Sequence, residues 1–191
     1  MKFRLLVFVF VLATAASAQR QDATFTGTAV IYGSGFNTRT TVRNFTLHIT
    51  GLTPASDADR FLGTLQERGQ DALLSSIRDH DLGRFSLSGE VGRPLNAVVV
   101  SSVGDKRMIR AVFERWMGFG ELRGGYRSTD YPFSYVEIVF DPRTGKGDGT
   151  FIPAARVRWN NKHAENEVEI EDFGIYPGRL IGVKLQRGSL P

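Results

Sequence analysis

The sequence contains no cysteine in its 191 residues. This absence excludes disulfide bonds, thiolate catalysis, cysteine-based zinc or iron–sulfur sites and a lipid anchor attached through cysteine. Histidine is also scarce. His48, His80 and His163 lie far apart in the sequence, with no H-E-x-x-H pair that would indicate a zinc site.

Long apolar runs are missing except at the N-terminus. Lys2 and Arg4 flank the start of an apolar run, Leu5–Ala13, and the small residues Ala16–Ala18 then match a cleavage site. The pattern predicts a secretory signal peptide over residues 1–18. The run is too short to cross a membrane, and no later stretch approaches about 18 apolar residues. We expect an exported protein, periplasmic or extracellular, with no membrane span in the mature chain.

Residues 19–191 would form the mature protein, and about 173 residues suit a single domain with a substantial core. The whole chain has 24 Lys+Arg and 20 Asp+Glu. Removing Lys2 and Arg4 leaves 22 basic against 20 acidic residues, a net charge of +2. A chain so close to neutral is a poor candidate for nucleic-acid binding, and we expect no nucleic-acid partner.

The C-terminal half is rich in alternating apolar and polar residues. It predicts four strands, at Tyr135–Phe140, Phe151–Trp159, Glu167–Phe173 and Arg179–Leu185. Residues 141–149, between the first two strands, are dense in glycine and other turn formers and predict a loop.

A hairpin of the second and third of these strands has a register in which opposite charges face each other. Arg158 then lies opposite Glu167, Arg156 opposite Glu169, Val157 opposite Val168 and Ala155 opposite Ile170. One face carries ion pairs and the other is apolar, as a half-buried antiparallel pair requires. The alternative is an acidic binding stripe made by the glutamates, but arginines across the strand favour ordinary cross-strand pairs.

A hairpin is also predicted near the N-terminus, from Ala23–Tyr32 and Thr41–Thr50 with a loop at 33–37. A helical hairpin follows at about 53–82. Its first helix would begin at Thr53-Pro54, with a capping hydroxyl and a proline in the first turn, and would end at Gly69 as a C-cap. The apolar stripes of the two helices are Phe61, Leu62 and Leu65, and Leu73, Leu74 and Ile77.

Strand patterns return after the helices. Phe85 and Leu87 alternate with serines, and Asn96–Ser102 is rich in valine. Arg107–Met117 fits both a helical and a strand face, but the preceding Gly-Asp turn and the valine-rich partner favour a strand in a hairpin.

The longest stretch without a regular pattern is Gly118–Pro132, which is rich in Gly, Arg and Tyr. Irregular loops of this length are often functional, and arginine and tyrosine often anchor binding surfaces. The alternative is a packed loop whose tyrosines cover a sheet edge. We predict a ligand-binding site here, formed by Trp116, Arg123, Tyr126, Arg127, Asp130 and Tyr131.

Motifs of known chemistry do not fit the chain. Gly145-Lys146-Gly147 lacks the remaining residues of a P-loop, and residues 141–149 lack the ligands of an EF-hand, although Asp141 and Asp148 leave room for a looser calcium site. Adjacent side chains on a helix do not share a face, so Asp79-His80-Asp81 predicts a solvated helix end. No G-x-S-x-G motif is present. We therefore predict no catalytic residue, no metal site and no cofactor. The sequence does not exclude a pair of carboxylates for glycoside hydrolysis, because such pairs assemble in three dimensions.

Four segments resemble a family of exported bacterial proteins of unknown function: Glu67–Leu74, Asp130–Phe133, Gly145–Gly149 and Glu169–Gly174. The resemblance covers most of the mature chain, and Asp148 stands where that family more often has Glu. It implies bacterial export and a single domain, and it implies no activity, ligand or catalytic residue.

The sequence as a whole predicts an α+β fold of mainly antiparallel strands, about nine of them, in a barrel-like or strongly curved sheet with one inserted helical hairpin. The leading functional hypothesis is a non-enzymatic binding protein, with an unknown small molecule in the barrel mouth or against the Trp116–Tyr131 segment. Two alternatives remain: a periplasmic hydrolase of a carbohydrate or ester, and a structural protein whose partner is a cell-envelope component.

Overall fold

A computed structural model describes residues 22–33, 39–117, 119–124, 126–160, 168–174 and 176–191. The predicted signal peptide, most of the 33–37 loop, His163 and Glu167 lie outside these ranges. The strands are β1 (Ala23–Ile31), β2 (Thr41–Ile49), β3 (Gly83–Leu87), β4 (Arg93–Pro94), β5 (Ala97–Val103), β6 (Lys106–Glu114), β7 (Phe133–Phe140), β8 (Lys146–Trp159), β9 (Val168–Asp172) and β10 (Gly178–Gly188). The helices are α1 (Ala55–Ile77), α2 (Phe119–Gly124) and the 3₁₀ helix η1 (Arg127–Asp130).

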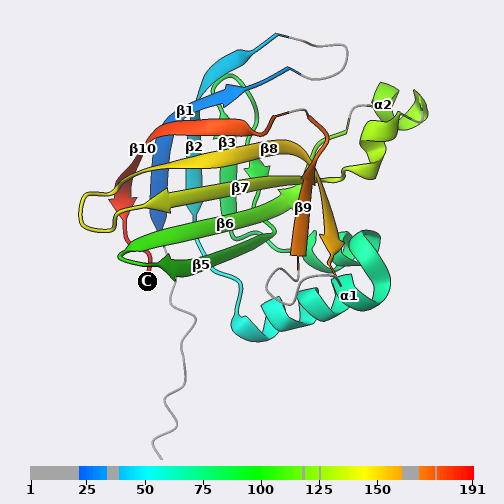
Figure 1. Cartoon of the computed structure of the whole chain (residues 1–191), viewed down its shortest axis with the longest axis horizontal. Coiled ribbons are helices and arrows are strands. Elements are labelled where there is room, and N and C mark those ends of the chain that lie inside the picture. The colour runs from blue at the N-terminus through cyan, green and yellow to red at the C-terminus, as the bar shows by residue number, and fades with distance from the viewer. Residues whose placement is uncertain (1–21, 34–38, 118, 125, 161–167, 175) are drawn as a thin grey trace, which may run out of the picture.

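The strands form one antiparallel sheet in the order β4-β3-β2-β1-β10-β8-β7-β6-β5. The sheet curls strongly into a half-barrel (Figure 1). β8 is long enough for two partners along one edge: β10 pairs with residues 146–151, and β9 pairs with residues 155–159. The predicted class is confirmed as mainly antiparallel β with a strongly curved sheet. The segment Arg107–Met117 is a strand, as predicted, over the range of β6.

Large apolar side chains fill the inner face of the half-barrel. Phe25, Phe45, Phe85, Phe113 and Phe151 are all buried there. Phe85 contacts three of the other rings, with centroid distances of 5.8 Å to Phe45, 5.9 Å to Phe113 and 4.8 Å to Phe151. Burying each such side chain contributes about 1.5–3 kcal/mol, so this aromatic interior makes a large contribution to stability.

The two ends of the sheet are bridged between β4 and β5. The backbone N–H of Leu95 donates to the oxygen of Gly83 at 2.8 Å, and its carbonyl accepts from Leu82 at 2.9 Å. The next residue, Asn96, donates its backbone N–H to the oxygen of Val112 at 3.2 Å. This short segment therefore passes from the β3 side of the sheet to the β6 side.

The predicted helical hairpin is not confirmed. The structure has one long helix, α1, with a kink at Gly69, whose φ of 78° and ψ of −174° lie outside the helical region. The predicted hydroxyl cap is also wrong: Thr53 Oγ1 accepts a hydrogen bond from the Val98 N–H at 2.8 Å and so ties the start of α1 to β5. Five of the six residues of the predicted stripes are buried, Phe61, Leu65, Leu73, Leu74 and Ile77, and they pack on the outer face of the sheet, whereas Leu62 is only partly buried.

The predicted loop at 141–149 is shorter than expected. The turn covers Asp141–Gly145, where the Gly145 N–H donates to the Asp141 oxygen at 2.8 Å, and β8 already begins at the next residue. Gly147 and Gly149 lie within the strand. Only glycine fits at these two positions, because a Cβ at either one would lie 2.1 Å from a carbonyl oxygen of β7. These glycines permit close backbone approach rather than a turn.

The predicted charge ladder between β8 and β9 has the right faces but the wrong register. Arg158 lies opposite Glu169 and Arg156 opposite Glu171, two residues from the predicted alignment. A shift of two residues keeps every side chain on its face. The Arg158 guanidinium also pairs with Glu171, while Val157 is buried against α1 on the outer face.

The segment Gly118–Pro132, predicted to be irregular, contains α2 and η1. In Figure 1, α2 lies at the edge of the molecule, away from α1. Within the described residues, no helix is both long enough and apolar enough to cross a membrane.

Candidate functional site

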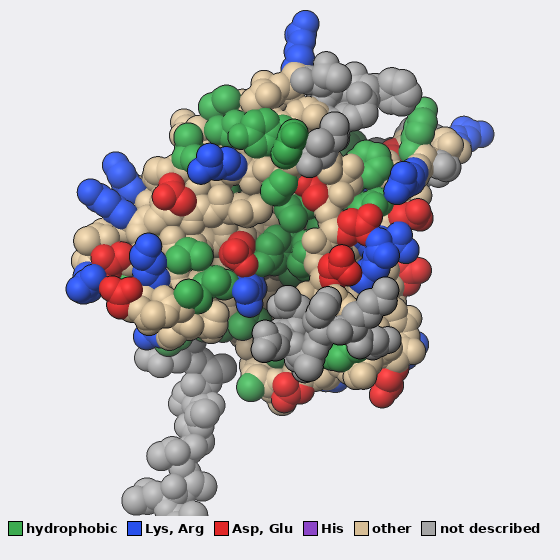
Figure 2. Space-filling view, in the orientation of Figure 1, with side chains coloured by type: hydrophobic (Ala, Val, Ile, Leu, Met, Phe, Trp, Pro, Cys, Tyr) green, Lys and Arg blue, Asp and Glu red, His purple; other side chains and the backbone are tan. Residues whose placement is uncertain are grey.

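An apolar groove of about 370 Å³ lies between α1 and the outer face of the sheet. One wall comes from the helix and its N-terminal approach, and the other comes from five strands, β5 to β9. The helix-side residues are Thr53, Ala58, Phe61, Leu62, Leu65, Leu73 and Ile77, and the sheet-side residues are Ala97, Val99, Arg110, Val112, Tyr135, Val157, Val168 and Ile170. Figure 2 shows hydrophobic side chains over the middle strands of the visible face, with charged side chains around them.

The groove exists because α1 does not follow the sheet evenly. The helix packs most closely on β8, where Ile152, Ala155 and Val157 are buried against it. Farther along the sheet, Val112 and Tyr135 are only partly buried, and Val99 is 43% exposed. The outer surface of β5–β7 therefore faces the helix across an open space.

A polar triad stands at the sheet side of the groove. Arg110 Nε donates to Glu137 Oε2 at 3.0 Å, and the Tyr135 hydroxyl donates to the same oxygen at 2.7 Å. Burial raises the pKa of Tyr135 well above its usual range, and the hydrogen bond to Glu137 raises it further. Tyr135 is therefore a neutral donor at physiological pH. Because a guanidinium has five N–H donors and the Glu137 contact uses one, Arg110 retains donors for a second polar group.

The groove has the features of a small-molecule site. Such sites have volumes of roughly 300–1,000 Å³, mostly apolar walls and a few well-placed polar groups. The sequence analysis placed wall residues such as Phe61, Leu65 and Val157 on apolar faces, and it did not single out Ala58 or Arg110. The gap depends on the distance between helix and sheet, for which the sequence carries no signal.

The six residues predicted as a binding site differ in burial, and their binding role stays a prediction. Tyr131 is buried, with 3% exposure; its hydroxyl donates to Glu171 at 2.6 Å, and its ring contacts Phe173 at 5.2 Å. Tyr131 is therefore packed within the structure, whereas the other predicted residues have more exposed side chains. The side chains of Arg123, Tyr126, Arg127 and Asp130 are exposed around α2 and η1. Trp116 is 69% exposed and borders a separate cleft.

Arg115, which the sequence did not single out, holds this segment in place. Its guanidinium pairs with Glu121, at 2.5 and 3.2 Å to the two carboxylate oxygens. It also donates to the carbonyl oxygens of Ser128 at 2.6 Å and Tyr131 at 2.5 Å. The Ser128 hydroxyl bonds to Glu121 as well. A side chain with these partners and only 10% exposure has a structural role.

The remaining polar residues that the structure describes do not gather into an ion-binding group. Over the described ranges, no group of three or more His, Asp and Glu side chains could hold an ion. Asp141 and Asp148 line the same open depression, but Lys106, Lys146 and Lys184 surround them and disfavour calcium. His48 Nδ1 is 3.0 Å from Thr24 Oγ1, and His80 packs on Phe61 at a ring distance of 5.5 Å.

Comparison with family models, curated proteins and solved structures found no significant match for this chain. The resemblance to exported bacterial proteins therefore stays a prediction. Any assignment of function depends on the geometry of the chain itself.

Proposed function

We propose that this chain is an exported, non-enzymatic binding protein that holds a small amphipathic molecule in the groove under α1. The observation that carries the proposal is the groove itself: about 370 Å³ of space with apolar walls and an arginine at its sheet side. The inner face of the half-barrel, where the sequence placed a possible ligand, is occupied by phenylalanine and aliphatic side chains. The outer face is therefore the better candidate.

The chemistry of the walls indicates the kind of ligand. Leu62, Val112 and Ile170 would cover an apolar body, and each buried CH₂ of the ligand contributes about 0.8 kcal/mol. Arg110 would hold an anionic or polar head, while its pair with Glu137 orients the guanidinium. We propose no chemical step at this site; the Tyr135 hydroxyl donates to Glu137 and helps to fix the carboxylate that orients Arg110.

The test uses anilinonaphthalene sulfonate, a fluorescent probe with an apolar ring system and one anionic group. The wild-type protein should bind the probe with saturation. A near-UV CD spectrum of the same sample should show native tertiary structure, because partly folded states also bind this probe. Ala58→Phe places a ring inside the groove and should weaken binding at least about tenfold, a loss of about 1.4 kcal/mol.

The matched control is Ala55→Phe, which adds the same ring to the exposed first residue of α1. It should leave binding unchanged. Arg110→Gln should weaken binding of the sulfonate and have little effect on an uncharged analogue. Equal affinity in Ala58→Phe and wild type would rule out the groove as the site.

A further inference from the structure

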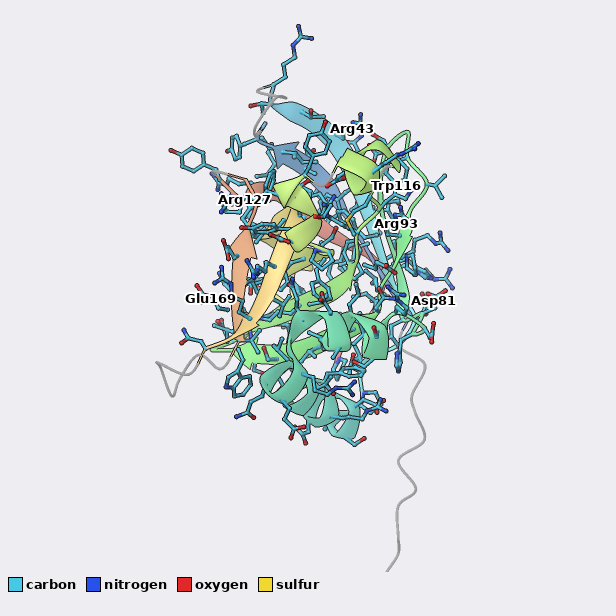
Figure 3. The ribbon with its side chains drawn as sticks, turned by 90° about the vertical axis from the view of Figure 1, so that its right-hand side faces the viewer. Arg43, Asp81, Arg93, Trp116, Arg127 and Glu169 are labelled. Atoms are coloured by element: carbon cyan, nitrogen blue, oxygen red, sulfur yellow. The ribbon has the colours of Figure 1, made fainter. Side chains whose placement is uncertain are left out.

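A second cleft, of about 340 Å³, lies where the end of β6 meets β4 and the C-terminal end of α1. Arg78, Arg93, Glu114, Arg115 and Trp116 are among the residues that line it. Figure 3 shows Trp116 and Arg93 close together on the same side of the molecule, between α2 and α1. This cleft does not overlap the groove under α1, since no lining residue is shared.

The floor of the cleft is rigid. Asn96, at its base, is 2% exposed, and its side chain bonds to the oxygens of Arg78 and His80 and to the N–H of Glu114. Arg115, beside it, is held by Glu121 and by two backbone oxygens. A binding site gains affinity when its walls need no ordering, and these contacts provide that condition.

The charges in the cleft are unequal. Arg78 pairs with Glu114 at 3.0 Å, and Arg115 pairs with Glu121 at 2.5 Å. Arg93 is only partly exposed, and among the residues that the structure describes its guanidinium has no hydrogen-bond or ion-pair partner. The cleft therefore presents one uncompensated positive charge, positioned for a carboxylate, which binds arginine through two parallel hydrogen bonds.

Trp116 supplies a second and different contact. Its side chain is 69% exposed, so most of the indole surface is accessible to a ligand. An indole face stacks on flat or apolar ring faces, including the C–H face of a pyranose, and its edge tolerates water.

We propose that this cleft binds an acidic sugar unit, with the pyranose ring on Trp116 and its carboxylate on Arg93. A ring ligand places both groups within one cleft of this size, whereas an uncharged sugar would leave Arg93 unused. The site is independent of the apolar ligand proposed for the groove.

The experiment is a tryptophan fluorescence titration in the Trp159→Phe background, which leaves Trp116 as the one tryptophan of the two in the chain. The probe is a short oligogalacturonate, with a neutral oligosaccharide of the same length as comparison. The oligogalacturonate should change the Trp116 emission with saturation, and the neutral sugar should bind at least about tenfold more weakly. Raising the salt concentration should weaken binding of the acidic sugar alone.

Arg93→Gln should reduce the affinity for the oligogalacturonate at least about tenfold and remove its salt dependence. Arg107→Gln, at the opposite end of β6, is the matched control and should leave the affinity unchanged. Ala58→Phe should also leave the affinity for the oligogalacturonate unchanged. A failure of the groove proposal can then be distinguished from a failure of this one. Absence of saturation below about 10 mM, or equal affinity in Arg93→Gln and wild type, would overturn the proposal.

Discussion

Asn96 joins three parts of the structure, and its truncation tests whether that junction stabilises the fold. The side chain donates to the oxygens of Arg78 and His80, at 3.0 and 2.9 Å, and accepts from the N–H of Glu114 at 2.8 Å. It therefore satisfies carbonyls at the C-terminal end of α1, which lack partners within the helix, and connects them to β6.

The cost of Asn96→Ala can be estimated group by group. The Glu114 N–H loses a buried acceptor, and leaving such a group without a partner costs about 1–3 kcal/mol. The two carbonyls border an open cleft, so water can replace part of their lost bonds, and we assign about 1 kcal/mol to both together. The total is about 3 kcal/mol, equivalent to a Tm decrease of about 9 °C for a chain of this size.

Urea unfolding followed by far-UV CD measures this value. The comparison is Asn44→Ala, an identical substitution at an exposed position of β2, which should change the free energy of unfolding by less than about 0.5 kcal/mol. The midpoint of Asn96→Ala should fall while the m-value stays constant. Equal stability of the two variants would show that the three hydrogen bonds contribute nothing net, and the reasoning would fail.

Two further predictions concern backbone conformation and pH. Gly69→Ala should destabilise the protein by about 1–2 kcal/mol, because residue 69 has a positive φ. Gly63→Ala lies in a regular turn of the same helix with open space around it and should stabilise the protein by about 0.5–1 kcal/mol. Thermal unfolding should therefore show a lower Tm for the first variant and a higher Tm for the second. Burial raises the pKa of Asp172, against the lowering effect of a backbone hydrogen bond from Gly174. The folded state therefore binds this proton more tightly than the unfolded state, so the charged carboxylate destabilises the fold above the folded pKa and the penalty disappears as pH falls. Asp172→Asn should be more stable than wild type by up to about 1 kcal/mol at pH 7 and equal to it near about pH 3. Urea unfolding at both pH values measures the difference. A gain in stability that persists at low pH would show that the buried charge of Asp172 is not its cause.

The strands could be predicted because each has one buried face. Phe45, Leu47 and Ile49 alternate with polar residues along β2, and all three are buried in the structure. The register of β8 and β9 could not be predicted, because Glu169 and Glu171 have the same spacing as Glu167 and Glu169. Charge pairing fixes the face, whereas the alignment also depends on how the chain continues into β10.

Glycine alone did not decide between a turn, a kink and a strand. Gly147 and Gly149 suggested a turn but lie within β8, where neighbouring carbonyls leave no room for a Cβ. Gly69 does interrupt the helical backbone, as predicted, but α1 continues beyond it as one kinked helix. The same residue type serves close approach, turns and kinks, so its local sequence does not decide among them.

The candidate sites were the least predictable part. Tyr131 was predicted as a ligand contact, and its partners in the structure, Glu171 in β9 and Phe173 just after it, lie about 40 residues away in sequence. Trp116 was identified from its residue type, while its neighbour Arg93 in the cleft comes from β4, a two-residue strand without a pattern. Contacts between distant segments created both arrangements.

The position of the end of α1 links the two proposed sites. Ile77, the last residue of the helix, lines the apolar groove, and the next residue, Arg78, lines the Arg93–Trp116 cleft. Asn96 fixes this end of the helix against β6 and so connects elements that border both openings. The inner face of the half-barrel is filled by side chains and offers no comparable freedom. Ligand-sized space arises where the kinked helix α1 meets the strongly curled sheet, and in this protein that junction lies on the outer face.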